Sequence, residues 1–279
     1  MERQAQVAGP LGAGASARLF TPSHRCGSGT PLVLLHGFAD TWRSWELVLP
    51  ALERRHEVLA PTLAGHAGGP PIEGEVSAAL LADHVERAMD EAGFDTAHIA
   101  GNSLGGHVAL QLAARGRART VVALAPAGGW APGDSSIEET FAFQSRLHEL
   151  AKAAAPHAEA MMATVEGRRG ATQYTTANFE HIPAELLAHI LRGVAACEDA
   201  PRLIDHARRS DWSLDAAQIA CPVRIVWGTD DRLLPWPSAA VRYRTKWLPH
   251  ADWVELDGVG HCPQLDVPLE TAQLILGFT

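Results

Sequence analysis

The sequence predicts an α/β protein: a mostly parallel central sheet flanked by helices, with a helical cap inserted between two strands. Two observations predict this fold class. Short runs rich in valine, leucine and isoleucine alternate with longer stretches of helical periodicity. Helices that connect consecutive strands in this way make the strands parallel and cover both faces of the sheet. The alternation stops near residue 128 and resumes only after residue 212.

The first half of the chain carries the regular alternation. We expect strands at 30–37, 56–65, 96–103 and 120–127, and helices at 41–55, 75–93 and 104–116. The run "TPLVLLHG" at 30–37 is continuously apolar, as is typical of a strand buried on both faces. The helix at 75–93 is amphipathic and ends at Gly93, a residue that often follows the last turn of a helix.

The second half contains an insertion and then the rest of the sheet. The insertion has helical stretches at 137–154, 157–166, 183–194 and 198–209, with Pro183 suited to the first turn of the third. A strand at 221–231, a helix around 237–247, a strand at 251–261 and a last helix from about 267 follow. We therefore expect a core domain formed by 1–127 and 213–279, and a helical cap, or lid, formed by 128–212.

Length and charge narrow the classes of function. A chain of 279 residues buries enough surface to fold without disulfide or metal staples. The net charge of −9 and the lack of a lysine and arginine cluster oppose nucleic-acid binding. The N-terminal segment "MERQAQVAGPLGAGASARLF" lacks the apolar core of a signal peptide, and no apolar run approaches the length of a membrane helix. We expect a cytoplasmic protein with a small-molecule substrate and without nucleic-acid or membrane partners.

The cysteines give no sign of a metal or redox centre. The chain has four of them, widely separated and without a C-x-x-C pair: Cys26, Cys197, Cys221 and Cys262. We expect reduced thiols, and neither a metal nor an organic cofactor.

The stretch "HIAGNSLGGH" places Ser103 between an expected strand and an expected helix. A sharp strand-to-helix turn at the carboxyl edge of the sheet crowds its central residue, and Gly101 and Gly105 leave room on either side. The N–H groups that follow lie at a helix N-terminus, where they favour a developing negative charge. The pattern indicates that Ser103 is a nucleophile; the alternative is a glycine-rich turn whose serine caps the helix.

A serine nucleophile needs a general base, and the base needs an acid that orients it. With this motif the expected order along the chain is serine, acid and histidine, each at the end of a strand. The strand "VRIVWG" is followed by Asp230 and Asp231, and the strand "WVELDGVG" is followed by His261. The order therefore fits a catalytic triad of Ser103, one of the two aspartates and His261.

From about residue 18 to the C-terminus the chain resembles the α/β-hydrolase superfamily. The resemblance rests on "LLHGFADTWRSW", "GNSLGG", "WGTDDRLLP" and "GVGHCPQLDVP". In that family the acid is the fourth residue of a G-x-x-D pattern, with a proline four residues later. Gly228, Asp231 and Pro235 match this pattern, so the resemblance implies Asp231 rather than Asp230 as the acid, and His261 as the base.

The resemblance also implies the position of the oxyanion hole. In the family two backbone N–H groups form it, and they correspond here to those of Phe38 and Leu104. A single His-Gly pair, rather than an H-G-G-G run, is similar to the esterase and C–C hydrolase branches. The triad needs no cofactor, and the resemblance implies none.

Serine in the nucleophile position excludes the branches that use aspartate there, such as haloalkane dehalogenases and epoxide hydrolases. The first hypothesis is a serine hydrolase that cleaves a small-to-medium, fairly apolar carboxylic ester or lactone through an acyl-enzyme on Ser103. One alternative is a C–C bond hydrolase of vinylogous diketones of the meta-cleavage type, although Cys262 stands where those relatives carry tryptophan. A perhydrolase or haloperoxidase-like activity, and a ligand-binding protein on a hydrolase scaffold, remain further alternatives.

Large apolar residues in and near the expected cap are candidate walls of a substrate pocket. Five are singled out: Trp130, Phe141, Met161, Met162 and Trp236. Ordinary packing within the cap is the alternative interpretation for each of them. The sequence does not identify the substrate or the oligomeric state.

Overall fold

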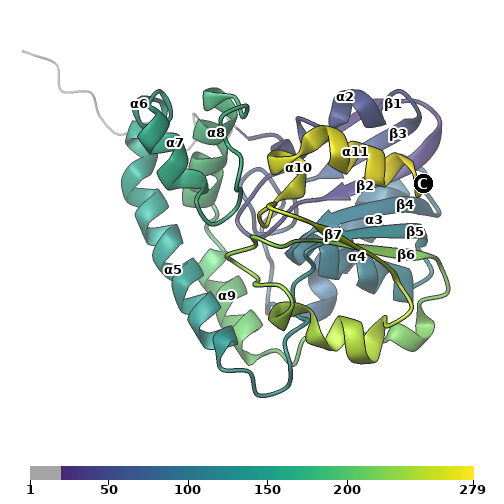
Figure 1. The fold of residues 1–279 in the computed structure, drawn as a ribbon. Helices are drawn as coiled ribbons and strands as arrows, with labels where there is room; N and C mark the ends of the chain where they lie inside the picture. The colour runs from purple at the N-terminus through teal and green to yellow at the C-terminus, as the bar shows by residue number, and fades with distance from the viewer. Residues whose placement is uncertain (1–19) are drawn as a thin grey trace, which may run out of the picture.

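The computed structural model describes residues 20–279, in which a seven-stranded sheet forms the centre of the molecule (Figure 1). The strands are β1 (Ser23–Gly27), β2 (Thr30–Leu35), β3 (His56–Pro61), β4 (Ala97–Asn102), β5 (Ala118–Leu124), β6 (Val223–Gly228) and β7 (Asp252–Leu256). They lie in the order β1-β3-β2-β4-β5-β6-β7, and all neighbours except the β1–β3 pair are parallel. The predicted fold class is confirmed. The expectation about a signal peptide, and the start of the expected core domain, fall on residues 1–19, outside the described part.

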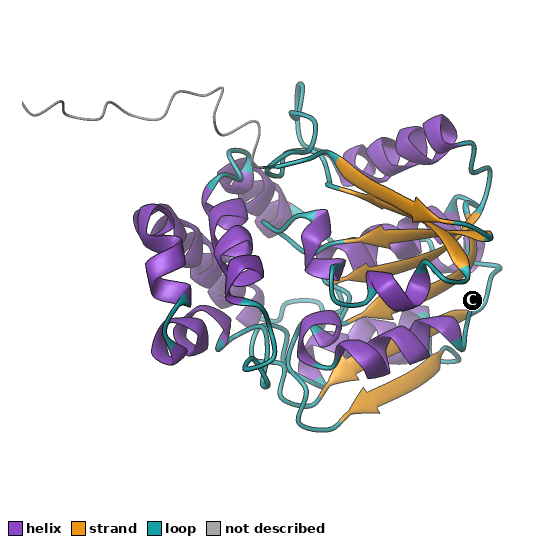
Figure 2. Ribbon diagram, turned by 90° about the horizontal axis from the view of Figure 1, so that it is seen from above, coloured by secondary structure: helices purple, strands orange, loops and turns teal. Residues whose placement is uncertain are grey.

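Alternating residues of the strands face two separate apolar layers. Val33 and Leu35 pack in one layer with α3 (Ala78–Ala92) and α4 (Leu104–Ala114). Leu32 and Leu34 pack in the other layer, with α2 (Leu49–Leu52) and α11 (Pro268–Leu276). Helices therefore cover both faces of the sheet, as Figure 2 shows, and the strands can be apolar on both sides.

Several elements differ from their predicted form. The helix expected at 41–55 is a 3-10 turn, η1 (Trp42–Trp45), followed by the short α2. The helix expected at 157–166 is divided into α6 (Ala158–Met162) and α7 (Val165–Thr172), because the Thr164 side chain accepts a hydrogen bond from the Gly167 N–H and begins a new helix. The helix expected around 237–247 consists of a 3-10 turn, η4 (Ser238–Ala240), and a π-helical turn, η5 (Tyr243–Trp247).

Strand β1 was not predicted. Its sequence, "SHRCG", is mostly exposed and shows no apolar alternation. It is held at the edge of the sheet by antiparallel pairing with β3, from Ser23 opposite Pro61 to Gly27 opposite Glu57. Backbone hydrogen bonds to a neighbouring strand, rather than burial of side chains, therefore make this segment a strand.

The helices between β5 and β6 lie together at one end of the sheet (Figure 1). They are α5 (Ser136–Ala154), α6, α7, α8 (Ala184–Ala195) and α9 (Ala200–Arg209), with the 3-10 turn η2 (Ala155–His157). Helix α5 packs against α8 and α9, and α6 packs against α8. Within residues 20–279, none of the helices combines the length and the apolar character that crossing a bilayer requires.

Candidate active site

Ser103 lies on a strained turn between β4 and α4. Its φ of 54° and ψ of −116° are rare for a residue with a side chain. Backbone hydrogen bonds hold this geometry: the Ser103 N–H donates to the Leu124 carbonyl at 2.9 Å, and its carbonyl accepts from the Ala127 N–H at 3.0 Å. A Cβ on Gly101 would lie 2.2 Å from the Gly105 oxygen, and one on Gly105 would lie 2.3 Å from the Leu35 oxygen. The turn therefore requires glycine at both positions.

Replacing Gly101 with alanine is expected to lower the free energy of unfolding by about 1–3 kcal/mol, because the new methyl group would overlap rigid backbone. Gly170 is the matched control, since it lies within α7 and a Cβ there would meet no atom within 4 Å. Alanine at this helical position is expected to stabilise the protein by up to about 1 kcal/mol. Urea denaturation of both variants tests this; equal effects would contradict it.

Asp231 and His261 are joined by a short hydrogen bond. The His261 Nδ1 lies 2.7 Å from one Asp231 oxygen, and both side chains are buried. The other Asp231 oxygen accepts hydrogen bonds from the Leu233 and Leu234 N–H groups at 2.9 and 2.7 Å. Asp230 is exposed, and its backbone N–H donates a hydrogen bond to the Val259 carbonyl at 3.0 Å. The geometry thus places Asp231, and not Asp230, against the histidine.

The second ring nitrogen of His261, Nε2, is buried and has no hydrogen-bond partner among the described residues. His261 and Ser103 line the same cavity. With Nδ1–H donating to Asp231, Nε2 carries a free lone pair, which is the state required of a general base. In proteins without substrate the bond between serine and histidine is often long and tightens only in the complex.

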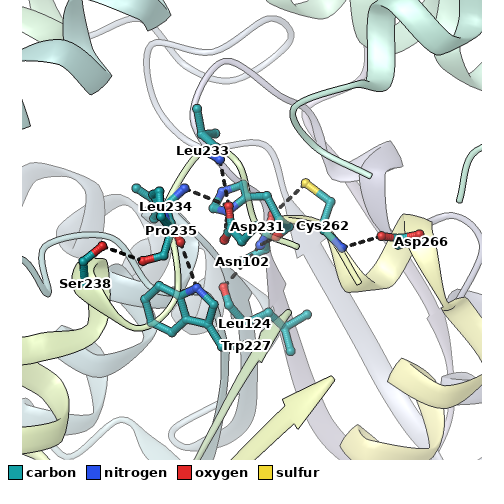
Figure 3. A network of polar contacts seen from close by, with 12 residues as sticks. Asn102, Leu124, Trp227, Asp231, Leu233, Leu234, Pro235, Ser238, Cys262 and Asp266 are labelled. Atoms are coloured by element: carbon teal, nitrogen blue, oxygen red, sulfur yellow. Dashed lines mark hydrogen bonds and ion pairs between the residues drawn. The ribbon is translucent and has the colours of Figure 1, made fainter. Parts of the chain in front are cut away.

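Asn102 connects the turn that carries Ser103 to the loop that carries His261 (Figure 3). Its buried Nδ2 donates to the carbonyl of His261 at 2.9 Å and to that of Leu124 at 3.2 Å. Its Oδ1 accepts from Gln264 Nε2 at 3.1 Å and from Cys262 Sγ at 3.4 Å. One amide therefore fixes the spacing between the two loops.

Replacing Asn102 with aspartate is expected to destabilise the protein by about 1–3 kcal/mol, because a carboxylate oxygen would face two carbonyl groups. We expect kcat to fall as well, because the loop that carries His261 loses the hydrogen bond from Asn102 Nδ2 to the His261 carbonyl. The exposed Gln218 provides a control, as Gln218→Glu makes the same change from amide to acid at the surface. Thermal unfolding and kcat are compared for the two variants, and similar losses in both would argue against the role of Asn102.

A buried carboxylate, Asp266, holds the His261 loop against the segment that precedes α8. It accepts hydrogen bonds from the N–H groups of Gly260 at 2.6 Å, Ala177 at 2.8 Å and Asn178 at 2.7 Å. Gly260 lies directly before His261 in the sequence. The position of the histidine is therefore tied to the inserted helical segment as well as to the sheet.

The N–H groups of Phe38 and Leu104 remain free. No described residue accepts a hydrogen bond from either of them. Leu104 is the first residue of α4, so its N–H has no partner within the helix. The loop that carries Phe38 lies beside Ser103, since a Cβ on Gly37 would be 3.5 Å from the Ser103 Cβ. Two unpaired donors thus flank the serine.

Two cavities meet at Ser103, with volumes of about 760 and 700 Å³ that include space open to solvent. We call them the aromatic cavity and the histidine cavity. The aromatic cavity is bounded mainly by apolar side chains, among them Leu81, Trp130, Phe141, Leu203, Ile204 and Trp212. The histidine cavity is bounded, among others, by Asp40, His148, Thr175, Leu233, His261 and Cys262. Ser103, Phe38 and Gln144 line both cavities.

The candidate pocket residues take different positions. Trp130 and Phe141 line the aromatic cavity. Met161 and Met162 line neither cavity; helix–helix contacts with α8 place them in a separate apolar cluster, in which Met162 is buried and Met161 partly buried. Trp236 also lines neither cavity, because its ring lies between those of Trp227 and Trp253.

Two important wall residues were not anticipated from the sequence. Trp212 stacks on Phe141, with ring centroids 6.1 Å apart and planes 9° apart. Trp130 follows β5, where the chain leaves the sheet, and Trp212 precedes β6, where the chain returns to it. A tryptophan near each end of the inserted segment is the sequence feature that could have pointed to Trp212 as a cavity residue. Asp40 follows the His-Gly turn, and burial raises its pKa to about 7. Its sequence position alone does not distinguish it from an ordinary loop aspartate.

Comparison with known proteins identifies the family. Residues 32–274 match the model of the alpha/beta hydrolase family. The chain is 35% identical over 213 residues to the epoxide hydrolase EphH of Mycobacterium tuberculosis, covering 73% of this chain and 95% of that protein. It is 26% identical over 269 residues to the putative carbamate hydrolase RutD of Azorhizobium caulinodans, covering 96% and 97% of the two chains.

Solved structures share the fold. A putative lipase from Acinetobacter baumannii superposes with a TM-score of 0.73 at 22% identity, covering 92% of this chain and 86% of that one. The 2-hydroxy-6-oxo-6-phenylhexa-2,4-dienoate hydrolase from a Rhodococcus species superposes with a TM-score of 0.71 at 20% identity, covering 92% and 96%. The match to the family model, the relatives and the shared architecture agree: this chain belongs to the alpha/beta hydrolase family and is a hydrolase.

Proposed function

We propose that the chain is a serine hydrolase that cleaves an uncharged, small-to-medium carboxylic ester or lactone through an acyl-enzyme on Ser103. The observation that carries this proposal is the buried Asp231–His261 pair beside a serine on a strained turn, at the meeting point of two cavities. A serine becomes a useful nucleophile only with such a base and orienting acid.

In this proposal each step uses a group already in place. The Ser103 hydroxyl attacks the carbonyl carbon and gives its proton to His261 Nε2. The free N–H groups of Phe38 and Leu104 stabilise the oxyanion that develops. His261 then passes the proton to the leaving alcohol, while Asp231 keeps the ring in the required tautomer. Water activated by the same nitrogen finally releases the acid.

The cavity walls favour an uncharged substrate. No lysine or arginine is among the described residues that line the two cavities. A carboxylate moved into such a site would lose its hydration without gaining a cationic partner. This weighs against the C–C bond hydrolysis alternative, since the structural relative in that class is named for a dienoate, which is an anion.

The relative named as an epoxide hydrolase makes epoxide opening the second candidate. Attack by Ser103 on an epoxide carbon would leave an ether, which has no carbonyl group for water to attack. Epoxide opening on this site would therefore need a water molecule activated directly by His261. Ser103 would then be dispensable, which separates this candidate from ester hydrolysis.

We further propose that residues 128–212 act as a cap over the site. Helix α5 supplies Phe141 to the aromatic cavity and His148 to the histidine cavity. The two cavities thus lie between the inserted helices and the carboxyl ends of the strands, where open α/β sheets bind their ligands.

The first test is hydrolysis of p-nitrophenyl esters from acetate to decanoate, with styrene oxide assayed in parallel. We expect turnover of esters, with an optimum at a short or medium acyl chain, and no epoxide opening. Epoxide opening without ester turnover would replace the first candidate by the second. If the protein hydrolysed neither the esters nor styrene oxide, both candidate functions would be contradicted.

A further inference from the structure

On the proposed function, the two cavities would receive different halves of an ester, and the position of His261 decides which half lies in which cavity. His261 must deliver a proton to the leaving oxygen, so the alcohol half extends toward the histidine. His261 is among the residues that line the histidine cavity and is not among those described for the aromatic cavity. The alcohol half therefore enters the histidine cavity, and the acyl half enters the aromatic cavity.

Three aromatic side chains lie together in the wall of the aromatic cavity, on the side of the acyl half. Trp130, Phe141 and Trp212 form a packed group there, with ring centroids 5.9 to 6.1 Å apart. Their faces and edges offer favourable contacts to a ring or a branched apolar chain. The acyl half that fits best is a ring-bearing, apolar one.

The alcohol side carries an acid that the triad does not use. Asp40 is the carboxyl group among the described residues that line the histidine cavity. One of its oxygens accepts a hydrogen bond from the Thr41 N–H at 2.7 Å, and no described cationic side chain forms an ion pair with it. Burial raises the pKa of Asp40 to about 7, against the opposing effect of its hydrogen bonds with Thr41 and Ser44. The Asp40 side chain is half-buried. A carboxylate held partly away from water without a cationic partner is costly, so it is suited to accept a hydrogen bond from a substrate.

We propose that Asp40 accepts a hydrogen bond from a second hydroxyl group on the leaving alcohol, so that the substrate is an ester of a ring-bearing apolar acid with a short polyol. This inference rests on the proposed function and names its substrate class. His148, whose pKa burial lowers, is a neutral neighbour in the same cavity and adds no positive charge that would attract an anion.

The test compares two esters of the same size, 2-hydroxyethyl phenylacetate and n-propyl phenylacetate, at pH 8. Their alcohol halves contain the same number of non-hydrogen atoms and differ by a hydroxyl in place of a methyl group. We expect the wild type to prefer the hydroxyethyl ester in kcat/KM by about tenfold, the size of one hydrogen bond to a charged group. For the acyl half, 2-hydroxyethyl acetate is expected to be a poorer substrate than the phenylacetate.

Two variants assign the preference to Asp40. Asp40→Asn can still accept from the Thr41 N–H, and we expect it to reduce the ratio of the two kcat/KM values. Asp40→Leu removes every polar atom, and we expect it to reverse the ratio in favour of the propyl ester. Asp90→Asn is the control: Asp90 is exposed on α3 and lines neither cavity, so the ratio should not change.

Three outcomes would overturn the proposal. One is a wild-type ratio of one or less. Another is an equal loss of activity toward both esters in the Asp40 variants, which would show that Asp40 only supports the loop. The third is failure of the proposed function itself, in which the wild type cleaves neither ester; this outcome is distinguishable because the other two require measurable hydrolysis of the propyl ester.

Discussion

Replacing Ser103 with alanine is expected to lower kcat for ester hydrolysis by about a thousandfold or more. The Ser103 Oγ is the atom that would bond to the acyl group in the acyl-enzyme. No other hydroxyl among the described residues lines both cavities. The fold should survive, because the Ser103 turn is held by the backbone hydrogen bonds to Leu124 and Ala127, which alanine keeps.

The measurement is kcat with the best p-nitrophenyl ester, together with the midpoint of thermal unfolding. Ser238→Ala serves as a control, since Ser238 is an exposed serine whose hydroxyl only donates to the Pro235 carbonyl. A Ser103→Ala variant that unfolds at the wild-type midpoint but has lost ester turnover supports the acyl-enzyme. Ester turnover that persists in Ser103→Ala would contradict it and would point to direct attack by water.

Replacing Asp231 with asparagine is expected to lower kcat by about 10³- to 10⁴-fold. The Leu233 and Leu234 N–H groups require an oxygen at one side-chain position, so the new amide NH₂ would face His261. His261 Nδ1 would then become an acceptor and Nε2 would carry the proton. A protonated Nε2 cannot accept the proton of Ser103.

Asp230→Asn is the matched control, because it makes the same chemical change one residue earlier on an exposed side chain. We expect its kcat to stay within about twofold of the wild type, as is usual for surface substitutions away from a site. Steady-state kinetics of the two variants on one ester suffices. A greater loss in Asp230→Asn than in Asp231→Asn would refute the assignment of the acid.

The sequence determined those features that depend on local backbone geometry and on burial of both faces of an element. Short apolar runs that alternate with helical stretches predicted six of the seven strands, and Gly101 and Gly105 predicted the tight turn around Ser103. The resemblance to the family pointed to Asp231 over Asp230, and the structure places Asp231 against His261. These features are readable because each leaves a pattern within a few neighbouring residues.

Only the tertiary structure decided the features that depend on partners far away in the chain. Strand β1 exists because β3 offers it hydrogen bonds, and its own side chains are mostly exposed. The walls of the two cavities combine residues from the loops after the strands with residues of α5 and α9, so Trp212 and Asp40 gain their positions only through the fold. Periodicity shows that a residue is buried, but not whether it faces a cavity or a neighbouring helix, as Met161 and Met162 do. Which groups meet at a site is therefore set by long-range packing, which local pattern does not encode.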